Sequence, residues 1–282
     1  MPNLSTALAL YEFSTYKEID KISGRSFYFD STSTNQTYTM RMPIGTSVNV
    51  DGVLYEGADA TNVVANVTHS GTIGFIESVP GCITYFFARN NGLSGNIPDL
   101  SLNVNLTHFY CYGNQLTGNI PDLSNNTVLR EFNCNTNQLT GTLPDLSANI
   151  ELRDFQCMSN RLTGSIPNLS LNTSLQYFYC ISNQLTGNIP DLSNNTSLRY
   201  IRLGSNKLTG FDGGTIKVKN EFSAYYNLLT VEAVDAILQA LVDGGTVNVR
   251  VLLQGGNGVP TNTAAIDTLR SNGCTVTVEG GY

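Results

Sequence analysis

The sequence predicts an α/β-type repeat solenoid, in which a short coil of chain recurs and stacks on itself with a parallel sheet along one face. Residues 114–124 recur letter for letter as residues 183–193, and both asparagine and proline return every 23 residues. The asparagine column is Asn91, Asn114, Asn137, Asn160, Asn183 and Asn206. A single coil cannot bury its own apolar side chains, so neighbouring coils must stack into a continuous core. The predicted solenoid covers residues 81–230.

Each coil contains one short strand followed by a turn and a second apolar segment. Its pattern is L-x-x-F-x-C-x-x-N-x-L-T-G-x-I-P-x-L-S-x-N-x-x. Leu106, Phe109 and Cys111 fall where alternate strand residues point inward. The asparagines supply amide groups to backbone atoms left free at the turn. The predicted structural core positions are Cys111, Cys134, Cys157, Cys180, Asn114, Asn137, Asn160 and Asn183.

The four cysteines of this column predict buried, reduced thiols. They replace an apolar residue, since the same position holds Ala88 and Leu203 in the flanking coils. Disulfides and a thiolate metal site are less favoured alternatives. Stacked in-register residues seldom offer disulfide geometry, and paired Cys-x-x-Cys ligands are absent from the sequence. We therefore expect no metal and no cofactor.

The repeat resembles the leucine-rich repeat, and its L-T-G-x-I-P half is similar to the plant-type subclass, whose repeat is usually one residue longer. The resemblance covers about residues 82–211. It implies a leucine-rich-repeat solenoid whose parallel sheet forms a concave face.

Residues 1–80 are expected to form an N-terminal region with a small β-sandwich. The expected strands are Thr37–Met42, Ser47–Val53, Asn62–Val67 and Thr72–Ile76. Residues 48–52 and 67–75 resemble PKD-like sandwich domains, although the tryptophan and the Gly-Asp-Gly of that pattern are missing.

Residues 231–282 are expected to form a C-terminal α/β capping unit, because a terminal coil needs a cover with a polar outer face. Thr230 is placed to begin a helix. The expected elements are a helix over Val231–Val242, a strand over Val247–Leu253, a helix over Thr261–Ser271 and a strand over Cys274–Val278. The ending resembles C-terminal caps of bacterial and phage repeat proteins.

The outward strand positions vary from coil to coil while the inward ones do not, which indicates a recognition surface. Tyr and Arg are enriched there, as at binding hot spots, and tyrosine rings also stack on sugars. The alternative is that exposed positions drift and that aromatics only stabilise the sheet. The predicted ligand-binding residues are His108, Tyr110, Tyr112, Glu131, Asn133, Asp154, Gln156, Met158, Tyr177, Tyr179, Ile181, Tyr200 and Arg202.

Charge and motifs exclude several functions. The net charge of −7 argues against nucleic-acid binding, and no apolar run is long enough for membrane insertion. The sequence shows no recognisable signal peptide. An enzyme is not expected. Glu131 and Asp154 could in principle act as a glycosidase pair, but Arg130 and Arg153 flank them, which favours salt-bridged surface charge.

We therefore expect a non-enzymatic adhesion or structural protein on a virion surface or outside a cell. A bacteriophage virion component (a decoration, fibre or host-attachment protein) is favoured, with a protein or glycan ligand and neighbouring virion proteins as partners. The alternative is a bacterial cell-surface or secreted leucine-rich-repeat protein, including an inhibitor of a secreted enzyme.

Overall fold

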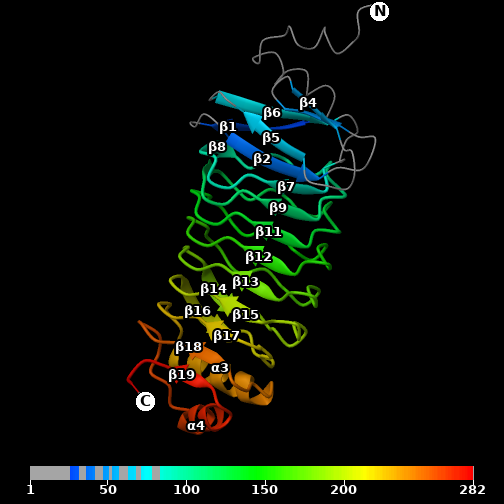
Figure 1. Ribbon diagram of the computed structural model, residues 1–282. Helices are drawn as coiled ribbons and strands as arrows, with labels where there is room; N and C mark the ends of the chain where they lie inside the picture. The colour runs from blue at the N-terminus through cyan, green and yellow to red at the C-terminus, as the bar shows by residue number, and fades with distance from the viewer. Residues whose placement is uncertain are drawn as a thin grey trace, which may run out of the picture.

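The computed structural model describes residues 26–31, 36–41, 47–50, 53–56, 63–67, 71–77 and 83–281, with side chains for residues 83–281. These residues form an elongated stack of coils that runs from antiparallel strands near the N-terminus to two helices at the C-terminal end (Figure 1). The N-terminal segment considered for a signal peptide lies outside the described residues.

The large sheet has 11 strands, and nine of them are parallel. Each coil adds one strand whose central residue is buried and whose two flanking residues point outward, the pattern predicted from the 23-residue period. We call the outward side the concave face. The parallel strands are β7 (Tyr85–Phe87), β9 (His108–Tyr110), β11 (Glu131–Asn133), β12 (Asp154–Gln156), β13 (Tyr177–Tyr179), β15 (Tyr200–Arg202), β17 (Glu221–Ser223), β18 (Arg250–Leu252) and β19 (Thr275–Thr277).

The opposite side of the coils carries two further pairs of parallel strands. They form where the L-T-G segments of successive coils meet. The strands are β8 (Leu93–Asn96), β10 (Gln115–Thr117), β14 (Thr186–Ile189) and β16 (Lys207–Phe211). At Gly141 the backbone φ is +75°, and an added Cβ would lie 2.3 Å from the Asn119 side chain, so a glycine is favoured there.

The N-terminal strands belong to two sheets, and each sheet continues into the solenoid. β2 pairs antiparallel with β7, and β1 pairs antiparallel with β8. These pairings close both sides of the first coil. The strands are β1 (Ser26–Ser31), β2 (Gln36–Arg41), β3 (Ser47–Val50), β4 (Val53–Glu56), β5 (Val63–Val67) and β6 (Gly71–Glu77).

Two details of this region differ from the sequence prediction. β1 (Ser26–Ser31) was not predicted. The segment predicted as one strand over Ser47–Val53 covers β3 and the first residue of β4, and these two strands pair antiparallel from Val50 and Val53 outward. Asp-Gly stands between them in the sequence and is a strong two-residue hairpin signal. The resemblance to PKD-like domains stays a prediction.

The C-terminal elements extend the same sheet. Helix α3 (Val231–Asp243) begins after Thr230, whose hydroxyl accepts a hydrogen bond from the Ala233 amide. Helix α4 (Thr263–Ser271) begins two residues later than predicted, because Asn262 caps it. The predicted strands are confirmed in shorter form as β18 and β19. Within the described residues, neither helix is long and apolar enough to cross a membrane.

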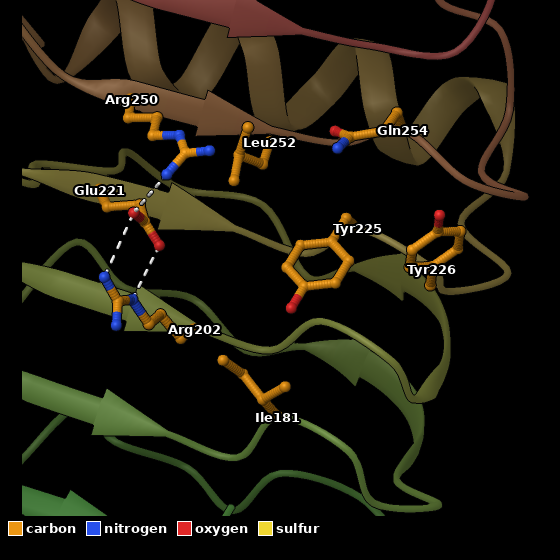
Figure 2. Close-up of a pocket in the computed structure, with 8 residues that line it drawn as sticks. All are labelled: Ile181, Arg202, Glu221, Tyr225, Tyr226, Arg250, Leu252 and Gln254. Atoms are coloured by element: carbon orange, nitrogen blue, oxygen red, sulfur yellow. Dashed lines mark hydrogen bonds and ion pairs between the residues drawn. The ribbon is translucent and has the colours of Figure 1, made fainter.

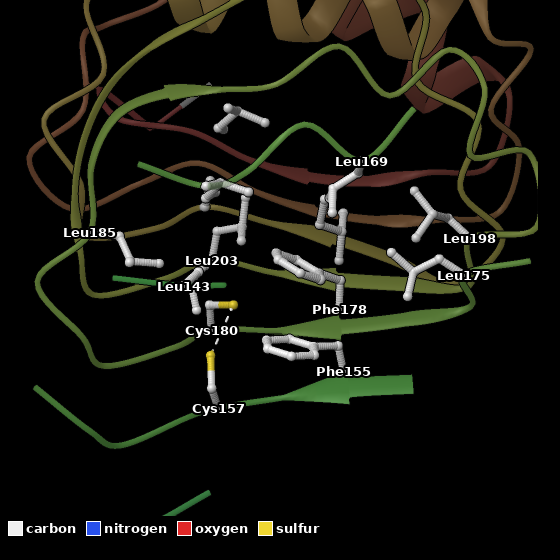
Figure 3. Close-up of a cluster of buried hydrophobic side chains, with 14 of the residues drawn as sticks. Leu143, Phe155, Cys157, Leu169, Leu175, Phe178, Cys180, Leu185, Leu198 and Leu203 are labelled. Carbon is white, nitrogen blue, oxygen red and sulfur yellow. Dashed lines mark hydrogen bonds between the residues drawn. The ribbon is translucent and has the colours of Figure 1, made fainter. Parts of the chain in front are cut away.

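The core is built from columns of identical side chains. Phe86, Phe109, Phe132, Phe155 and Phe178 stack with ring centroids 5.2 to 5.8 Å apart and are fully buried. Beside them run the four buried cysteines, which are reduced, as predicted. Figure 3 shows Cys157 and Cys180 next to the rings of Phe155 and Phe178. Each buried ring or leucine contributes about 1.5–3 kcal/mol, but only once a neighbouring coil covers it.

The asparagine column forms the predicted ladder of hydrogen bonds. Asn160 Nδ2 donates to the carbonyls of Cys134 (3.0 Å) and Cys157 (3.1 Å), and its Oδ1 accepts from the Leu139 amide (3.0 Å). Asn114, Asn137 and Asn183 repeat this pattern. The ladder continues through Asn206, Asn227 and Asn257 into the C-terminal elements.

A second asparagine ladder was missed by the sequence analysis. Its members are fully buried and donate Nδ2 to two carbonyls of the preceding coil. They are Asn126, Asn149, Asn172 and Asn195. This ladder explains the repeated asparagine in the L-S-x-N part of the pattern.

Candidate functional site on the concave face

The predicted outward residues lie in register on neighbouring strands. His108, Glu131, Asp154, Tyr177 and Tyr200 form one column. The second column holds Tyr110, Asn133, Gln156, Tyr179 and Arg202, and the third holds Tyr112, Met158 and Ile181 at the ends of the strands. The structure therefore brings all the predicted site residues together on one face.

The face begins with a group of rings that we call the N-terminal aromatic cluster: Tyr85, Phe87, His108, Tyr110 and Tyr112. Tyr85 contacts His108 and Tyr110 with ring centroids 5.4 and 5.6 Å apart. Phe87 lies edge-on to Tyr110 and Tyr112. Tyr85 and Phe87 were missed, although they stand 23 residues before His108 and Tyr110 and the period could have found them.

Arg89 extends this cluster at its edge. Its guanidinium lies 5.9 Å from the centre of the Phe87 ring, and its Nη1 donates to the Tyr112 hydroxyl at 3.4 Å. The result is a partly exposed aromatic surface with a cation at its rim.

Glu131 is held by the N-terminal aromatic cluster rather than by an arginine. The Tyr110 hydroxyl donates to its Oε2, and His108 Nε2 lies 3.6 Å from its Oε1. The contact with His108 is the main reason that the pKa of Glu131 lies below its usual range. The Tyr110 hydrogen bond lowers this pKa further, and burial opposes both.

Asp154, on the next strand, is a partly buried carboxyl group. Burial, helped by the charge of Glu131, raises the pKa of Asp154 to about 7, against the opposing hydrogen bond from Gln156. Its Oδ2 accepts from Gln156 Nε2 at 2.9 Å, and its Oδ1 is buried with no hydrogen-bond partner. The predicted salt bridges to Arg130 and Arg153 are therefore wrong. Arg130 approaches Glu151 (3.9 Å), and among the described residues no arginine pairs with either carboxyl group.

The two carboxyl groups have pKa values shifted in opposite directions, as in acid–base pairs of glycosidases. The geometry does not favour that chemistry, because Glu131 is engaged by two side chains and the free oxygen of Asp154 is buried. A substrate could not reach the buried Oδ1 of Asp154, which would have to donate the proton as the general acid.

A network of side-chain amides occupies the centre of the face. Asn133 and Asn135 both donate Nδ2 to Gln156 Oε1, at 3.2 and 2.8 Å. The Oδ1 of Asn135 accepts from the backbone amide of Met158 at 2.6 Å. These bonds fix the polar side chains in one arrangement, so this part of the surface is preorganised.

Next comes the tyrosine cluster, which consists of Tyr177, Tyr179, Tyr200 and Arg202. Tyr177 and Tyr200 stack 5.8 Å apart, and Tyr179 meets both edge-on. The guanidinium carbon of Arg202 lies 5.0 Å from the ring centres of both Tyr179 and Tyr200. Burial raises the pKa of Tyr179 to about 12, and the charge of Arg202 opposes this, so the phenol is neutral near neutral pH.

A pocket of about 410 Å³ follows the tyrosine cluster at the C-terminal end of the face (Figure 2). Its lining includes Ile181 and Arg202, which were predicted. It also includes Glu221, Arg250 and Gln254, which were not. The spacing from Asn206 to Asn227 is 21 residues, and α3 lengthens the next coil, so the 23-residue period gives no register for these strands.

The described residues offer no metal site. No group of three histidine, cysteine or acidic side chains that could hold a metal ion is present in this part of the chain.

The coil architecture is shared with solved structures. The PEPR1–AtPEP1 structure matches with a TM-score of 0.59 and 23% identity over 71% of this chain and 28% of that one. A TDR receptor matches with a TM-score of 0.54 and 23% identity over 71% and 35%. A sequence profile named Leucine Rich Repeat matches residues 105–127, one complete coil. The chain is a leucine-rich-repeat protein.

This leucine-rich-repeat protein spans about a third of the length of those two structures, and the likeness to them shows the fold. The functional domain of InlJ from Listeria monocytogenes, described as including a cysteine ladder, matches at a TM-score of 0.45 and 21% identity over 69% of this chain and 45% of that one. No curated protein sequence matches the chain.

Proposed function

We propose that this leucine-rich-repeat protein is a non-enzymatic recognition protein that binds a protein or glycan through its concave face. The observation that carries the proposal is the succession of the N-terminal aromatic cluster, a polar centre and the tyrosine cluster along one face. Coil closure requires none of these side chains, because the inward phenylalanine, cysteine and leucine columns and the two asparagine ladders already hold the coils together.

The chemistry of the face suits recognition. Tyrosine rings and arginines give large contact areas at low entropic cost. The hydrogen bonds within the polar centre keep its amide groups in place before a ligand arrives. Structures with the same fold include PEPR1–AtPEP1 and a TDR receptor, which is in keeping with a binding role.

The test is binding of the purified full chain to a panel of whole bacterial cells, glycans and proteins. The variant combines Tyr177→Ala with Tyr179→Ala. The control combines Ile150→Ala with Leu171→Ala, two side chains that are 56% and 57% exposed outside the strands. We expect saturable binding that the tyrosine variant loses and the control keeps, with circular dichroism unchanged in both. Binding that survives in the tyrosine variant would place the site elsewhere.

Display on the outside of a bacteriophage virion, or of a bacterial cell, is the second part of the proposal. Charged residues make up only 13% of the chain, and the C-terminal sequence resembles caps of bacterial and phage repeat proteins. Detection of the chain by mass spectrometry in purified virions, or in a cell-surface fraction, would support one location or the other. Recovery only from the interior of cells would contradict both.

A further inference from the structure

Next to the pocket beyond the tyrosine cluster, two small residues stand in columns of large ones. Gly204 occupies the position held by Tyr112, Met158 and Ile181 in other coils, and an added Cβ would lie 2.6 Å from the Tyr225 ring. Ser223 lies between Arg202 and Leu252 in the second column. The pocket is lined by the large side chains next to these two positions, and by neither small residue.

The pocket holds two arginines and one carboxylate, so one positive charge is not balanced within it. Glu221 is buried, with its side chain 8% exposed, and Arg202 binds it through Nε (2.8 Å) and Nη2 (3.3 Å). This pairing satisfies the carboxylate. Arg250 is 61% exposed and reaches Glu221 only through Nη1, at 3.8 Å. Its remaining donors are available to an anion in the pocket (Figure 2).

Two polar atoms in this region lack a hydrogen-bond partner, and one of them belongs to a residue that lines the pocket. Ser223 is 1% exposed, and its Oγ makes no hydrogen bond. Gln254 lines the pocket, and its Oε1 is buried without a partner. Figure 2 shows the amide end of Gln254 turned toward the space between Leu252 and Tyr225. A buried polar group without a partner is costly, so a ligand that supplies hydroxyl groups would gain affinity here.

Rings form the side of the pocket away from the arginines. Tyr225 and Tyr226 meet edge-on at 5.5 Å, and Tyr226 is 61% exposed. An apolar ring face can lie against such tyrosines. The pocket volume is at the small end of the range for small-molecule sites, about 300–1,000 Å³. It suits one sugar residue.

We propose that this pocket binds a monosaccharide unit that carries a carboxylate, such as a uronic acid within an acidic glycan. The carboxylate pairs with Arg250, a ring hydroxyl donates to Gln254, and the apolar ring face lies against the tyrosines. An acidic peptide side chain would satisfy Arg250 but offers neither the ring hydroxyl nor the ring face. The inference rests on the proposed function, since it names the ligand class for one end of the concave face.

The test compares methyl β-D-glucuronide with methyl β-D-glucoside, which differ only in the carboxylate. Binding to the full chain is followed by saturation-transfer NMR and by tyrosine fluorescence, which is unobscured because the chain has no tryptophan. We expect saturable binding of the glucuronide and binding of the glucoside weaker by about fivefold or more. Arg250→Gln should reduce the glucuronide to the level of the glucoside.

Two further variants sharpen the test. Arg161→Gln, which alters an exposed arginine bonded to Gln138 on another part of the coil, should change neither affinity. Gln254→Leu removes the amide acceptor at the pocket and should weaken the binding of both sugars in a protein whose thermal unfolding remains cooperative.

Several outcomes would overturn the inference: equal binding of the two sugars, no binding of either, no effect of Arg250→Gln, or stronger binding of N-acetylglutamate amide than of the glucuronide. If Tyr177→Ala with Tyr179→Ala abolishes cell or protein binding while the glucuronide never binds, the pocket inference fails and the proposed function stands. If the glucuronide binds through Arg250 but the panel shows no ligand for the intact face, the proposed function fails instead.

Discussion

The sulfur of Cys157 lies 3.2 Å from the sulfur of Cys180, one coil further along the core. The two thiols are fully buried and reduced, and each is packed beside a phenylalanine ring of its own coil. Their contact is a weak hydrogen bond between side chains that occupy the same position in successive coils. The cysteine column therefore acts as part of the apolar core.

The first prediction concerns thiol reactivity. Burial raises the pKa of the Cys111, Cys134 and Cys157 thiols, so almost no thiolate forms near pH 8. We expect iodoacetamide to leave these cysteines unmodified in the native protein and to label them fully in urea, as read by mass spectrometry of peptides. Labelling of Cys134 in the folded protein, or a Cys157–Cys180 disulfide after purification, would contradict the role in the core.

The second prediction concerns the asparagine ladder. Asn160→Ala removes four hydrogen bonds and leaves the Leu139 amide without its partner, while the carbonyls of Cys134 and Cys157 keep their bonds from Asn137 and Asn183. We expect a loss of about 3 kcal/mol in the free energy of unfolding, measured by urea denaturation. Asn194→Ala, at an exposed position, is the control and should change this free energy by less than about 0.5 kcal/mol. Equal effects of the two substitutions would mean that the ladder contributes little.

The third prediction concerns Asp154 and pH. Its pKa is about 7 in the folded protein and near 3.8 in the unfolded chain, so the folded state holds the proton more tightly. The contribution of Asp154 to stability therefore rises as pH falls from about 7 toward 4, and the ionised form destabilises the protein at higher pH.

Asp154→Asn should stabilise the protein at about pH 8 and reduce the change in unfolding free energy between about pH 5 and pH 8. The control is Asp145→Asn. Hydrogen bonds from Ser147 lower the pKa of Asp145, so its contribution to stability changes with pH only below the ordinary range of aspartate and is constant between about pH 5 and pH 8. A pH dependence that is the same in wild type and Asp154→Asn would show that the carboxyl group is solvated.

The fourth prediction concerns the buried carboxylate of Glu221. Arg202→Met leaves this group with only the longer contact to Arg250, at 3.8 Å, and we expect a loss of about 3 kcal/mol in stability. Arg250→Met, which changes an exposed side chain, should cost less than about 1 kcal/mol. Glu221→Gln in the Arg202→Met background should recover part of the loss. A double variant no more stable than Arg202→Met alone would show that the charge of Glu221 is not the cause.

Much of the solenoid could be predicted because its information is local and repeated. A fixed period places Glu131 beside Asp154 and Tyr177 beside Tyr200 once one coil is aligned with the next. The inward positions of Phe155 and Cys157 follow from strand alternation. The coil length changes after Asn206, so the 23-residue period no longer predicts which residues lie side by side. The contact between Arg202 and Glu221 therefore could not be predicted from the repeat.

The environment of Asp154 could not be predicted for a different reason. Its burial depends on how neighbouring side chains fold over the sheet, and the same sequence is compatible with Arg153 turning toward it. The orientation of Gln156, which donates to Asp154 and accepts from two asparagines, decides which carboxyl oxygen is left without a partner. Rotamer choices of this kind leave no periodic signal.

Because the strand register is constant, equivalent side chains on the concave face are separated by a fixed repeat distance. The N-terminal aromatic cluster and the tyrosine cluster are separated by whole coils, and each coil adds about 4.8 Å along the stack. Duplication or loss of one 23-residue unit between them would change their separation by that step and leave both clusters intact. A gene that gains or loses repeats can thus change the distance between the two clusters without altering the residues of either.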